Sequence, residues 1–241
     1  MKDLYDVTKL NSALFEYGIT LSDEQTDKFL TYYEMLIEKN KVMNLTAITE
    51  YDEVILKHFV DSISLCQVMD LHKEIKVLDL GTGAGFPGIP LKIVFPELKI
   101  TLFDSLNKRL VFLQEVIDEL SLTNIETVHG RAEEAARNKM YREQFDLCVS
   151  RAVANISTLS EYCLPFVKVG GQCISYKSGA VDDELSGKEA AIEKLGGELH
   201  DVFKFTLPDS DQTRAFVIVD KVKSTPKAYP RKAGTPSKEP L

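Results

Sequence analysis

The chain has 241 residues, of which 44% are hydrophobic, and this is enough for one sizeable α/β domain with appendages. Its formal net charge of −8 argues against a general nucleic-acid-binding protein. The N-terminus is charged and no long apolar run follows, so we expect a soluble cytoplasmic protein with no signal peptide and no membrane segment. Four scattered cysteines without a C-x-x-C pair, and four histidines without ligand spacing, predict reduced thiols and no metal site.

Residues 1–70 are predicted to form a helical extension. Apolar spacing over 7–18 predicts a first helix, and the glycine at its end suits the left-handed position that follows a helix. Ser22 stands three residues before a glutamine, which is a capping box, and it opens a predicted helix to about residue 41. A third helix is predicted over 52–69.

Three polar residues of this extension are candidates for positioning a substrate. Asn44 lies in the connector before the third helix, and His58 and Asp61 share a helix face because they are three residues apart. That face would approach the cofactor or shape a substrate entrance. The alternative, which the sequence alone favours, is a surface pair together with an asparagine that satisfies its own turn.

The most informative stretch is residues 75–90, IKVLDLGTGAGFPGIP. An apolar strand leads into glycines at alternate positions and then into an amphipathic helix, which is how a nucleotide-binding α/β unit begins. Glycines are needed where a ligand lies against bare backbone or where φ is positive. The predicted cofactor-binding residues of this turn are Gly81, Gly83, Gly85 and Phe86.

The spacing also distinguishes between cofactors. The third glycine of a dinucleotide motif, G-x-G-x-x-G, would fall on Phe86, and no phosphate-binding P-loop sequence is present. Asp79 makes the turn acidic, which suits a cationic ligand with an amine, so we predict S-adenosylmethionine (SAM). Asp104 ends the next predicted strand, where this fold class places an acid for the ribose hydroxyls. A generic βαβ turn with a solvated aspartate is the alternative.

Residues 71–222 are expected to form the cofactor-binding domain, because predicted strands and helices alternate along them. The last two apolar segments are separated by a short polar turn and predict a hairpin. The expected architecture is therefore a mostly parallel sheet with an antiparallel hairpin edge. The predicted strands are 75–80, 99–104, 124–129, 145–150, 172–177, 199–207 and 214–222. The predicted helices are 88–95, 106–120 (with Ser105 as its N-cap), 131–140, 156–167 and 182–196.

Residues that follow the strands are candidate contacts, because ligands bind at the carboxyl ends of parallel strands. Glu133 follows the third strand and would accept a hydrogen bond from the adenine amino group. Arg151 and Lys177 follow the fourth and fifth strands, and would hold the cofactor carboxylate or an incoming phosphate. An ordinary ion pair at the rim is the alternative for each residue.

Residues 223–241 are rich in proline and lysine, which predicts an extended arm rather than a helix or a strand. From Lys221 onward there are six basic residues and one acidic residue, whereas the rest of the chain is acidic. Cations bind phosphates and an aromatic ring stacks on a base, so the arm is predicted to contact RNA. The predicted contacts are Lys227, Tyr229, Arg231 and Lys232. A disordered, solubilising tail is the alternative.

Several motifs together resemble the RsmG family, also called glucose-inhibited division protein B, which are bacterial methyltransferases of 16S ribosomal RNA. GTGAG alone is common to many methyltransferases, whereas DSLNKR, SRAVA and YPRK-x-G-x-P together are far more specific. The matching stretches are NLTAIT (44–49), KHFVDS (57–62), LDLGTGAGFPGIPL (78–91), DSLNKR (104–109), RAE (131–133), SRAVA (150–154) and YPRKAGTPSK (229–238).

This resemblance implies a class I SAM-dependent fold with a helical N-terminal extension. It implies transfer of the SAM methyl group to N7 of a guanine in 16S ribosomal RNA, with free RNA or the small ribosomal subunit as partner. The cofactor contacts that it implies are Gly81, Phe86, Ala132, Glu133 and Arg151. A monomer is the default expectation, because the sequence shows no interface stripe.

The residues agree in part with an N7 target. Guanine N7 is a lone-pair acceptor, so positioning replaces a general base or a covalent nucleophile. The chain lacks the Asn-Pro-Pro-Tyr loop of amine methyltransferases, and Cys163 lies in an apolar helical segment that predicts a core position. Asp61 and Asn44 are candidates to face the positive charge that develops on the guanine. The alternatives are a small-molecule methyltransferase, a nicotinamide oxidoreductase and a non-catalytic ribosome-binding module that retains SAM as a structural ligand.

Overall fold

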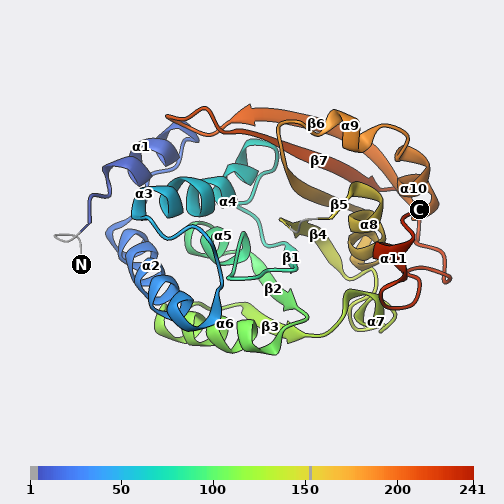
Figure 1. Cartoon of the computed structure of the whole chain (residues 1–241), viewed down its shortest axis with the longest axis horizontal. Helices are drawn as coiled ribbons and strands as arrows, with labels where there is room; N and C mark the ends of the chain where they lie inside the picture. The colour runs from blue at the N-terminus through green and yellow to red at the C-terminus, as the bar shows by residue number, and fades with distance from the viewer. Residues whose placement is uncertain (1–4, 152–153) are drawn as a thin grey trace.

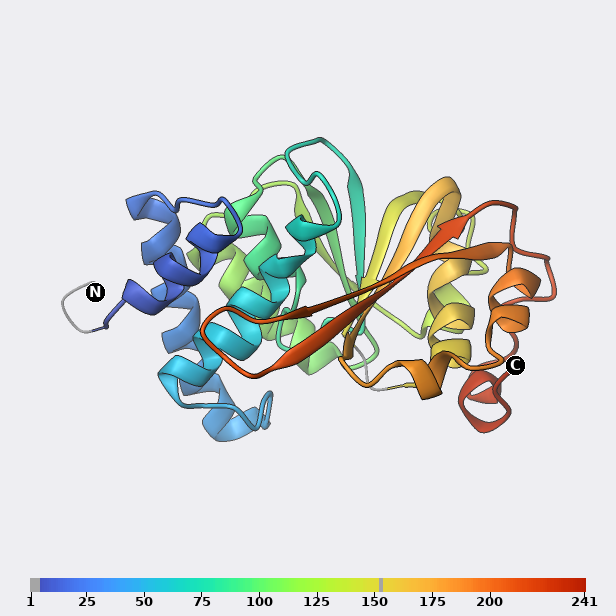
Figure 2. The same ribbon diagram turned by 90° about the horizontal axis from the view of Figure 1, so that it is seen from above.

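The computed structural model describes residues 5–151 and 154–241, so two residues of the SRAVA motif lie outside the described part. Its centre is a seven-stranded sheet with helices on both faces (Figures 1 and 2). The strand order is β3-β2-β1-β4-β5-β7-β6. The strands are β1 (Lys76–Leu80), β2 (Lys99–Asp104), β3 (Ile125–His129), β4 (Phe145–Ser150), β5 (Val167–Ser178), β6 (Gly197–Thr206) and β7 (Thr213–Lys221).

The predicted topology is confirmed. Strands β1 to β5 pair in parallel, whereas β7 runs antiparallel to both β5 and β6 and forms the hairpin edge. Strand β5 begins five residues earlier than expected, and the preceding helix ends at Cys163 rather than at residue 167. A short 3₁₀ turn that contains Pro165 separates the two elements, because proline cannot donate the hydrogen bond that would continue the helix.

Alternate residues of the strands point to two separate cores. Val77 and Ile100 face the first core, and Leu78 and Phe103 face the second. The elements on the first face are α1 (Thr8–Glu16), α2 (Asp23–Met43), α3 (Tyr51–Val54), η1 (Ile55–Val60), α4 (Asp61–Ile63), η2 (Ser64–Gln67), α5 (Gly88–Val94) and α6 (Asn107–Glu119). Those on the second face are α7 (Ala132–Ala135), α8 (Ile156–Cys163), η3 (Leu164–Phe166), α9 (Asp182–Leu185), α10 (Glu189–Lys194) and α11 (Thr235–Lys238).

The predictions for the end of the first helix and the start of the second helix are confirmed. Gly18 adopts φ 74° just after α1, and the capping box of Ser22 and Gln25 is complete at the start of α2. Asn44 ends α2 in a left-handed conformation, with φ 50°. The connector that follows is held by Asn40, whose side chain exchanges two hydrogen bonds with the backbone of Thr46.

Four helix predictions are corrected. The expected helix over 52–69 is interrupted by the π-helical turn η1, which places His58 and Asp61 in the interior. Ser105 does not cap α6, because the Asp104 carboxylate instead accepts from the amide of Leu106. The predicted helix over 182–196 is two short helices, and the one over 131–140 is reduced to α7.

The helical extension packs onto the glycine turn through aromatic rings. Tyr32 lies with its ring centroid 5.5 Å from that of Phe59 and 5.5 Å from that of Phe86. Its buried hydroxyl donates to the carbonyl of Ala84 at 2.5 Å. A Cβ at Gly85 would lie 2.6 Å from this hydroxyl, so the third glycine of the turn is needed for helix packing.

The prediction that residues 223–241 form an extended arm is wrong. The segment after β7 folds back on the domain and includes the helical turn α11, with Pro230 and Pro236 buried (Figure 1). Lys221, counted with the basic tail, is fully buried, and its ammonium donates to the carbonyls of Leu164 and Val167. The segment is therefore neither extended nor a loose tail.

Candidate active site

A cavity of about 800 Å³ opens at the carboxyl ends of β1, β2 and β4, and we call it the cofactor cavity. Its position follows the rule for open parallel sheets, and its volume suits a ligand of nucleoside size. The lining residues are Leu45, His58, Leu80, Gly81, Phe103, Asp104, Ser105, Arg109, Gly130, Arg131, Ala132, Glu133, Ser150, Arg151, Leu159, Tyr162, Gly234 and Ser237. Five predicted cofactor residues are thus brought together, namely Gly81, Asp104, Ala132, Glu133 and Arg151.

The three glycines of the turn have different surroundings. Gly81 lines the cavity, whereas Gly83 donates its amide to Asp104 at 3.0 Å, and a Cβ at Gly83 would lie 3.9 Å from the carbonyl oxygen of Gly81. Gly85 and Phe86 face the helical extension instead. The turn therefore presents bare backbone to the cavity on one side and a packing surface on the other.

The carboxylate of Asp104 is almost fully buried and already bonded. It accepts from the amides of Gly83 and Leu106 and from Arg109, whose Nη1 lies 3.2 Å from Oδ2. An ionised carboxylate has about four acceptor positions, so one remains for a ligand. Its predicted bond to the ribose hydroxyls stays a prediction, and the structure supplies a rigidly oriented acid for it.

Asp79 does not make the cavity acidic. Its carboxyl group is fully buried below the glycine turn, where Oδ2 accepts from Thr82 Oγ1 at 2.7 Å and from the Gly88 amide at 2.9 Å. Oδ1 has no hydrogen-bond partner. Burial raises the pKa of Asp79 to about 7, despite the opposing effect of these two hydrogen bonds. The acids that line the cavity are Asp104 and Glu133, and Asp79 is not among them.

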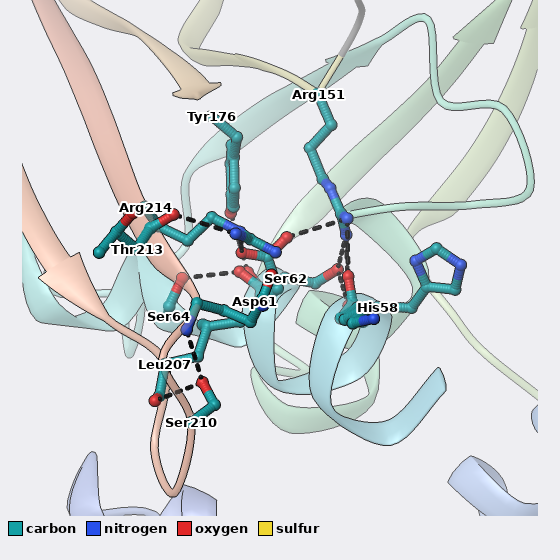
Figure 3. A network of polar contacts seen from close by, with 12 residues as sticks. His58, Asp61, Ser62, Ser64, Arg151, Tyr176, Leu207, Ser210, Thr213 and Arg214 are labelled. Atoms are coloured by element: carbon teal, nitrogen blue, oxygen red, sulfur yellow. Dashed lines mark hydrogen bonds and ion pairs between the residues drawn. The ribbon is translucent and has the colours of Figure 1, made fainter. Parts of the chain in front are cut away.

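Arg151 connects the cavity to the helical extension (Figure 3). Its guanidinium donates to the carbonyls of Lys57 at 2.9 Å and His58 at 3.3 Å, and to Ser62 Oγ at 3.0 Å. It also pairs with Asp61 at 2.9 Å, and its charge lies 5.7 Å from the centre of the Phe86 ring. The alternative of an ordinary ion pair at the rim is therefore wrong for Arg151, which belongs to an internal network of hydrogen bonds and an ion pair.

Asp61 is the centre of this network. One oxygen is bound by Arg151, and the other accepts from Nε of Arg214, which starts β7, at 3.0 Å (Figure 3). Tyr176 on β5 donates its hydroxyl to the carbonyl of Ser62 at 2.8 Å. The surface pair that the sequence favoured for His58 and Asp61 is therefore wrong, since both side chains are buried.

A second cavity, of about 680 Å³, shares Arg151 with the cofactor cavity as a lining residue. Its lining residues are Asp61, Arg151, Ala154, Asn155, Tyr176, Lys177, Ser178, Glu184 and Arg214. Lys177 donates to the carbonyl of Ala154 and pairs with Glu184 at 2.7 Å, so its charge is partly offset. The cavity still carries three cations against two carboxylates.

His58 forms part of the wall of the cofactor cavity. Its ring stacks on Phe86 at 4.4 Å and 17°, and its Nε2 lies 2.8 Å from Thr46 Oγ1. Burial, assisted by the charge of Arg151, lowers the pKa of His58 to about 3, so the ring is neutral at physiological pH. Asn44 is exposed and lies next to Leu45, which lines the cavity.

The C-terminal segment takes an unexpected part in the site. Gly234 and Ser237 line the cofactor cavity, and the Gly234 amide donates to Glu133 Oε1 at 2.8 Å. Arg231, predicted to contact RNA, is instead bound to the fully buried carboxylate of Glu161 at 2.6 Å. Tyr229 packs on the second core and beneath Lys194, whereas Lys227 and Lys232 are exposed.

Sequence reasoning missed several lining residues, namely Leu45, Leu159, Tyr162, Gly234 and Ser237. Leu45 and Gly234 lie within the family-like motifs NLTAIT and YPRKAGTPSK, which was the available signal. Leu159 and Tyr162 lie on α8 and carry no pattern that separates them from core residues.

Three general observations concern the part of the chain that the structure describes. Within it, no group of three or more potential ligands could hold a metal ion, and no helix is long and apolar enough to cross a membrane. Its four cysteines are free thiols, and Cys163 is buried in the second core as predicted.

The arrangement fits SAM. The backbone of the glycine turn at Gly81, an oriented acid at Asp104 and the acceptor Glu133 surround a cavity of suitable volume. In fold, the chain is similar to the SAM-dependent methyltransferase SibL in its apo form, with TM-score 0.54 and 16% identity over 83% of this chain and 70% of SibL. It is also similar to a mutant of MtNAS, with TM-score 0.55 and 14% identity over 83% and 75% of the two chains. Fold and site together define a class I SAM-dependent methyltransferase.

The sequence identifies the family within this class. Residues 25–213 match the GidB family, described as rRNA small subunit methyltransferase G. Proteins named ribosomal RNA small subunit methyltransferase G are 55% identical in Lachnoclostridium phytofermentans, over 95% of both chains, and 52% identical in Acetivibrio thermocellus, over 97% of both. The chain belongs to this family and is a SAM-dependent rRNA methyltransferase.

Proposed function

We propose that the protein transfers the methyl group of SAM to N7 of a guanine in 16S ribosomal RNA, with the target nucleotide entering the second cavity. The observation that carries this assignment is that the two cavities adjoin at Arg151, which lines both. A cofactor on one side of this residue and a base on the other would be neighbours. The family to which the chain belongs supports the choice of small-subunit rRNA.

The chemistry requires positioning rather than proton transfer. SAM supplies a methyl group on a sulfonium, and the carbon–sulfur bond breaks as the bond to N7 forms, leaving a neutral thioether. Guanine N7 has no proton to lose, so no residue must act as a base. The neutral, buried imidazole of His58 is consistent with this, because a base with a pKa of about 3 would be ineffective at neutral pH.

The second cavity offers contacts for the target nucleotide. Arg151, Lys177 and Arg214 supply guanidinium and ammonium groups, which bind phosphates and the O6 and N7 edge of guanine. Asp61 lines the same cavity and would oppose the positive charge that develops on the base, even though each of its oxygens already contacts an arginine. Exposed Lys227 and Lys232 would contact more distant phosphates.

The test is methyl transfer from labelled SAM to intact small subunits and to their free RNA, followed by identification of the labelled nucleoside. We expect 7-methylguanosine in at least one substrate, and the better substrate identifies the partner. A different methylated nucleoside would refute the N7 assignment. Absence of label in both RNAs, with SAM binding intact, would refute the RNA substrate.

The role of the second cavity is tested with Lys177→Ala. We expect normal affinity for SAM but an increased KM for RNA, because this lysine lines only the second cavity. Lys204→Ala is the control, since this residue also forms an ion pair, but an exposed one that lies on β6 and outside both cavities. An unchanged KM for RNA in the Lys177 variant would remove the second cavity from the assignment.

A further inference from the structure

We propose that residues 229–238 form a wall of the cofactor cavity and determine its affinity for SAM. The ion pair between Arg231 and Glu161 holds this segment in place. This segment carries basic residues, and the sequence assigns it to RNA. The contacts of the folded segment point inward to the cofactor cavity.

The segment reaches the cavity with its backbone. Gly234 and Ser237 lie among the lining residues, and the Gly234 amide donates to Glu133 at 2.8 Å. Gly234 adopts φ 82°, a conformation that favours glycine, so the amide is directed by a turn that other residues form poorly. Glu133 is 7% exposed and lines the same cavity, so the segment orients one of the acids expected to bind the cofactor.

Arg231 fastens the segment to α8. Its backbone amide donates to Glu161 Oε1 at 2.7 Å, while Nε and Nη2 contact Oε1 and Oε2 at 3.0 and 2.6 Å. Glu161 is fully buried, so removal of this partner would leave a buried carboxyl group without its cation. A second tie follows five residues later, where Thr158 donates to the carbonyl of Pro236 at 3.0 Å.

The residues that lead into the segment are also held by hydrogen bonds. Arg142 donates to the carbonyls of Thr225 and Tyr229 at 2.7 and 3.0 Å, and Arg137 donates to the carbonyl of Pro230 at 2.5 Å. These donors come from the loop between α7 and β4, which leads away from the cavity residue Ala132. Polar contacts thus hold the segment before, within and after the turn at Gly234, whose amide donates to Glu133.

These contacts make cofactor affinity depend on the segment. If Arg231 loses Glu161, the turn at Gly234 is no longer held against Glu133, and the cavity loses two lining residues and an oriented acceptor. The remaining contacts around the glycine turn would still bind SAM, although more weakly. The expected result is a lower affinity rather than an unfolded protein.

The first experiment measures SAM binding by calorimetry on the full chain without RNA. We expect Arg231→Ala to weaken binding of SAM, and of its product S-adenosylhomocysteine, at least tenfold. Lys223→Ala is the matched control, because it removes a positive charge from an exposed lysine just before the segment, and its affinity should stay within twofold of the unmodified protein. A folded Arg231→Ala protein with unchanged affinity would overturn the proposal.

The second experiment uses the unmodified protein, so it stands even if Arg231→Ala fails to fold. Hydrogen exchange is followed with and without saturating SAM. We expect slower exchange of amides in residues 229–238, above all Gly234, and no change in the hairpin turn 207–212. Protection of the glycine turn 81–86 without any change in 229–238 would overturn the proposal. Neither experiment involves RNA, so failure of the proposed RNA substrate would leave both results intact.

Discussion

The two ends of the chain both border the cofactor cavity, but they are attached in different ways. The N-terminal extension contributes Leu45 and His58 and is held by buried aromatic rings. The C-terminal segment contributes Gly234 and Ser237 and is held by an ion pair and by hydrogen bonds to backbone carbonyls. The same cavity therefore has one apolar attachment and one polar attachment.

Because of this difference, we expect one attachment to affect global unfolding and the other to affect local opening of the structure. Apolar burial of Phe29, Tyr32 and Phe59 continues directly into the core beneath the sheet, so the extension can leave only if the protein unfolds. The contacts of the C-terminal segment are mainly an ion pair and directional hydrogen bonds, and a segment held in this way can open without global unfolding. We expect the first attachment to determine stability and the second to determine ligand access.

The largest effect is expected at Phe59, which packs on Phe29 and Tyr32. Phe59→Ala removes a fully buried ring from the apolar attachment and should lower the free energy of unfolding by about 3–5 kcal/mol. Urea denaturation measures this loss. The control is Phe15→Ala, whose ring is 74% exposed and whose loss should cost less than about 0.5 kcal/mol. Similar losses in both variants would contradict the assignment of the extension to the core.

The next effect concerns Asp79, which lies below the glycine turn on which the N-terminal extension packs. Its pKa is raised to about 7 in the folded protein and is about 4 in an unfolded chain, so the folded state holds a proton between these values. Its contribution to stability is present below pH 4 and is lost as the pH rises through 7, by at most about 4 kcal/mol.

Comparison of Asp79→Asn with the unmodified protein isolates this effect. Denaturation at several pH values should show that the unmodified protein loses stability relative to the variant between pH 4 and 7. Other groups, including His58 with its lowered pKa, are common to both proteins and cancel. A constant difference across this range would show that Asp79 titrates normally.

A smaller effect is expected for Thr158→Val in the polar attachment. The substitution keeps the shape of the side chain but removes the donor to the Pro236 carbonyl, at a cost of about 1 kcal/mol. Hydrogen exchange in 229–238 should become several-fold faster, while exchange in α2 stays unchanged. Equal acceleration in both regions would mean that the segment opens only by global unfolding.

The smallest effect concerns the exposed lysines of the segment. Lys227→Ala with Lys232→Ala should reduce the slope of log affinity for RNA against log salt concentration by about one to two. Adding Arg231→Ala should change this slope little further, because its charge is already paired with Glu161. If Arg231→Ala reduced the slope as much as either lysine substitution, Arg231 would contact RNA. This result would contradict the proposal that Arg231 holds the segment at the cofactor cavity.

Local patterns in the sequence predicted the features that depend on neighbouring residues. The Ser22 capping box, the strand–glycine–helix unit and the hairpin edge all involve contacts within one or two elements. The burial of His58 and Asp61 could not be predicted in this way, because the π-helical turn forms around Arg151, some ninety residues further along the chain.

The C-terminal segment shows the same limit more clearly. Its proline and lysine content predicted an extended arm, since composition reports what a segment does in isolation. Arg231 has its partner seventy residues earlier in Glu161, a residue that helical spacing does not mark as buried. Asp79 illustrates the reverse error, because a carboxylate beside a glycine turn was taken as a charge that faces the cofactor, whereas the strand buries it.

The shared position of Arg151 has a consequence for the order of events in catalysis. A nucleotide that attracts this guanidinium would compete with Asp61 and would also shift the cation above Phe86. Binding of either substrate should then change the affinity for the other by the same factor, since the two equilibria are linked. Initial-rate patterns should accordingly show interdependent substrates rather than two sites that fill independently.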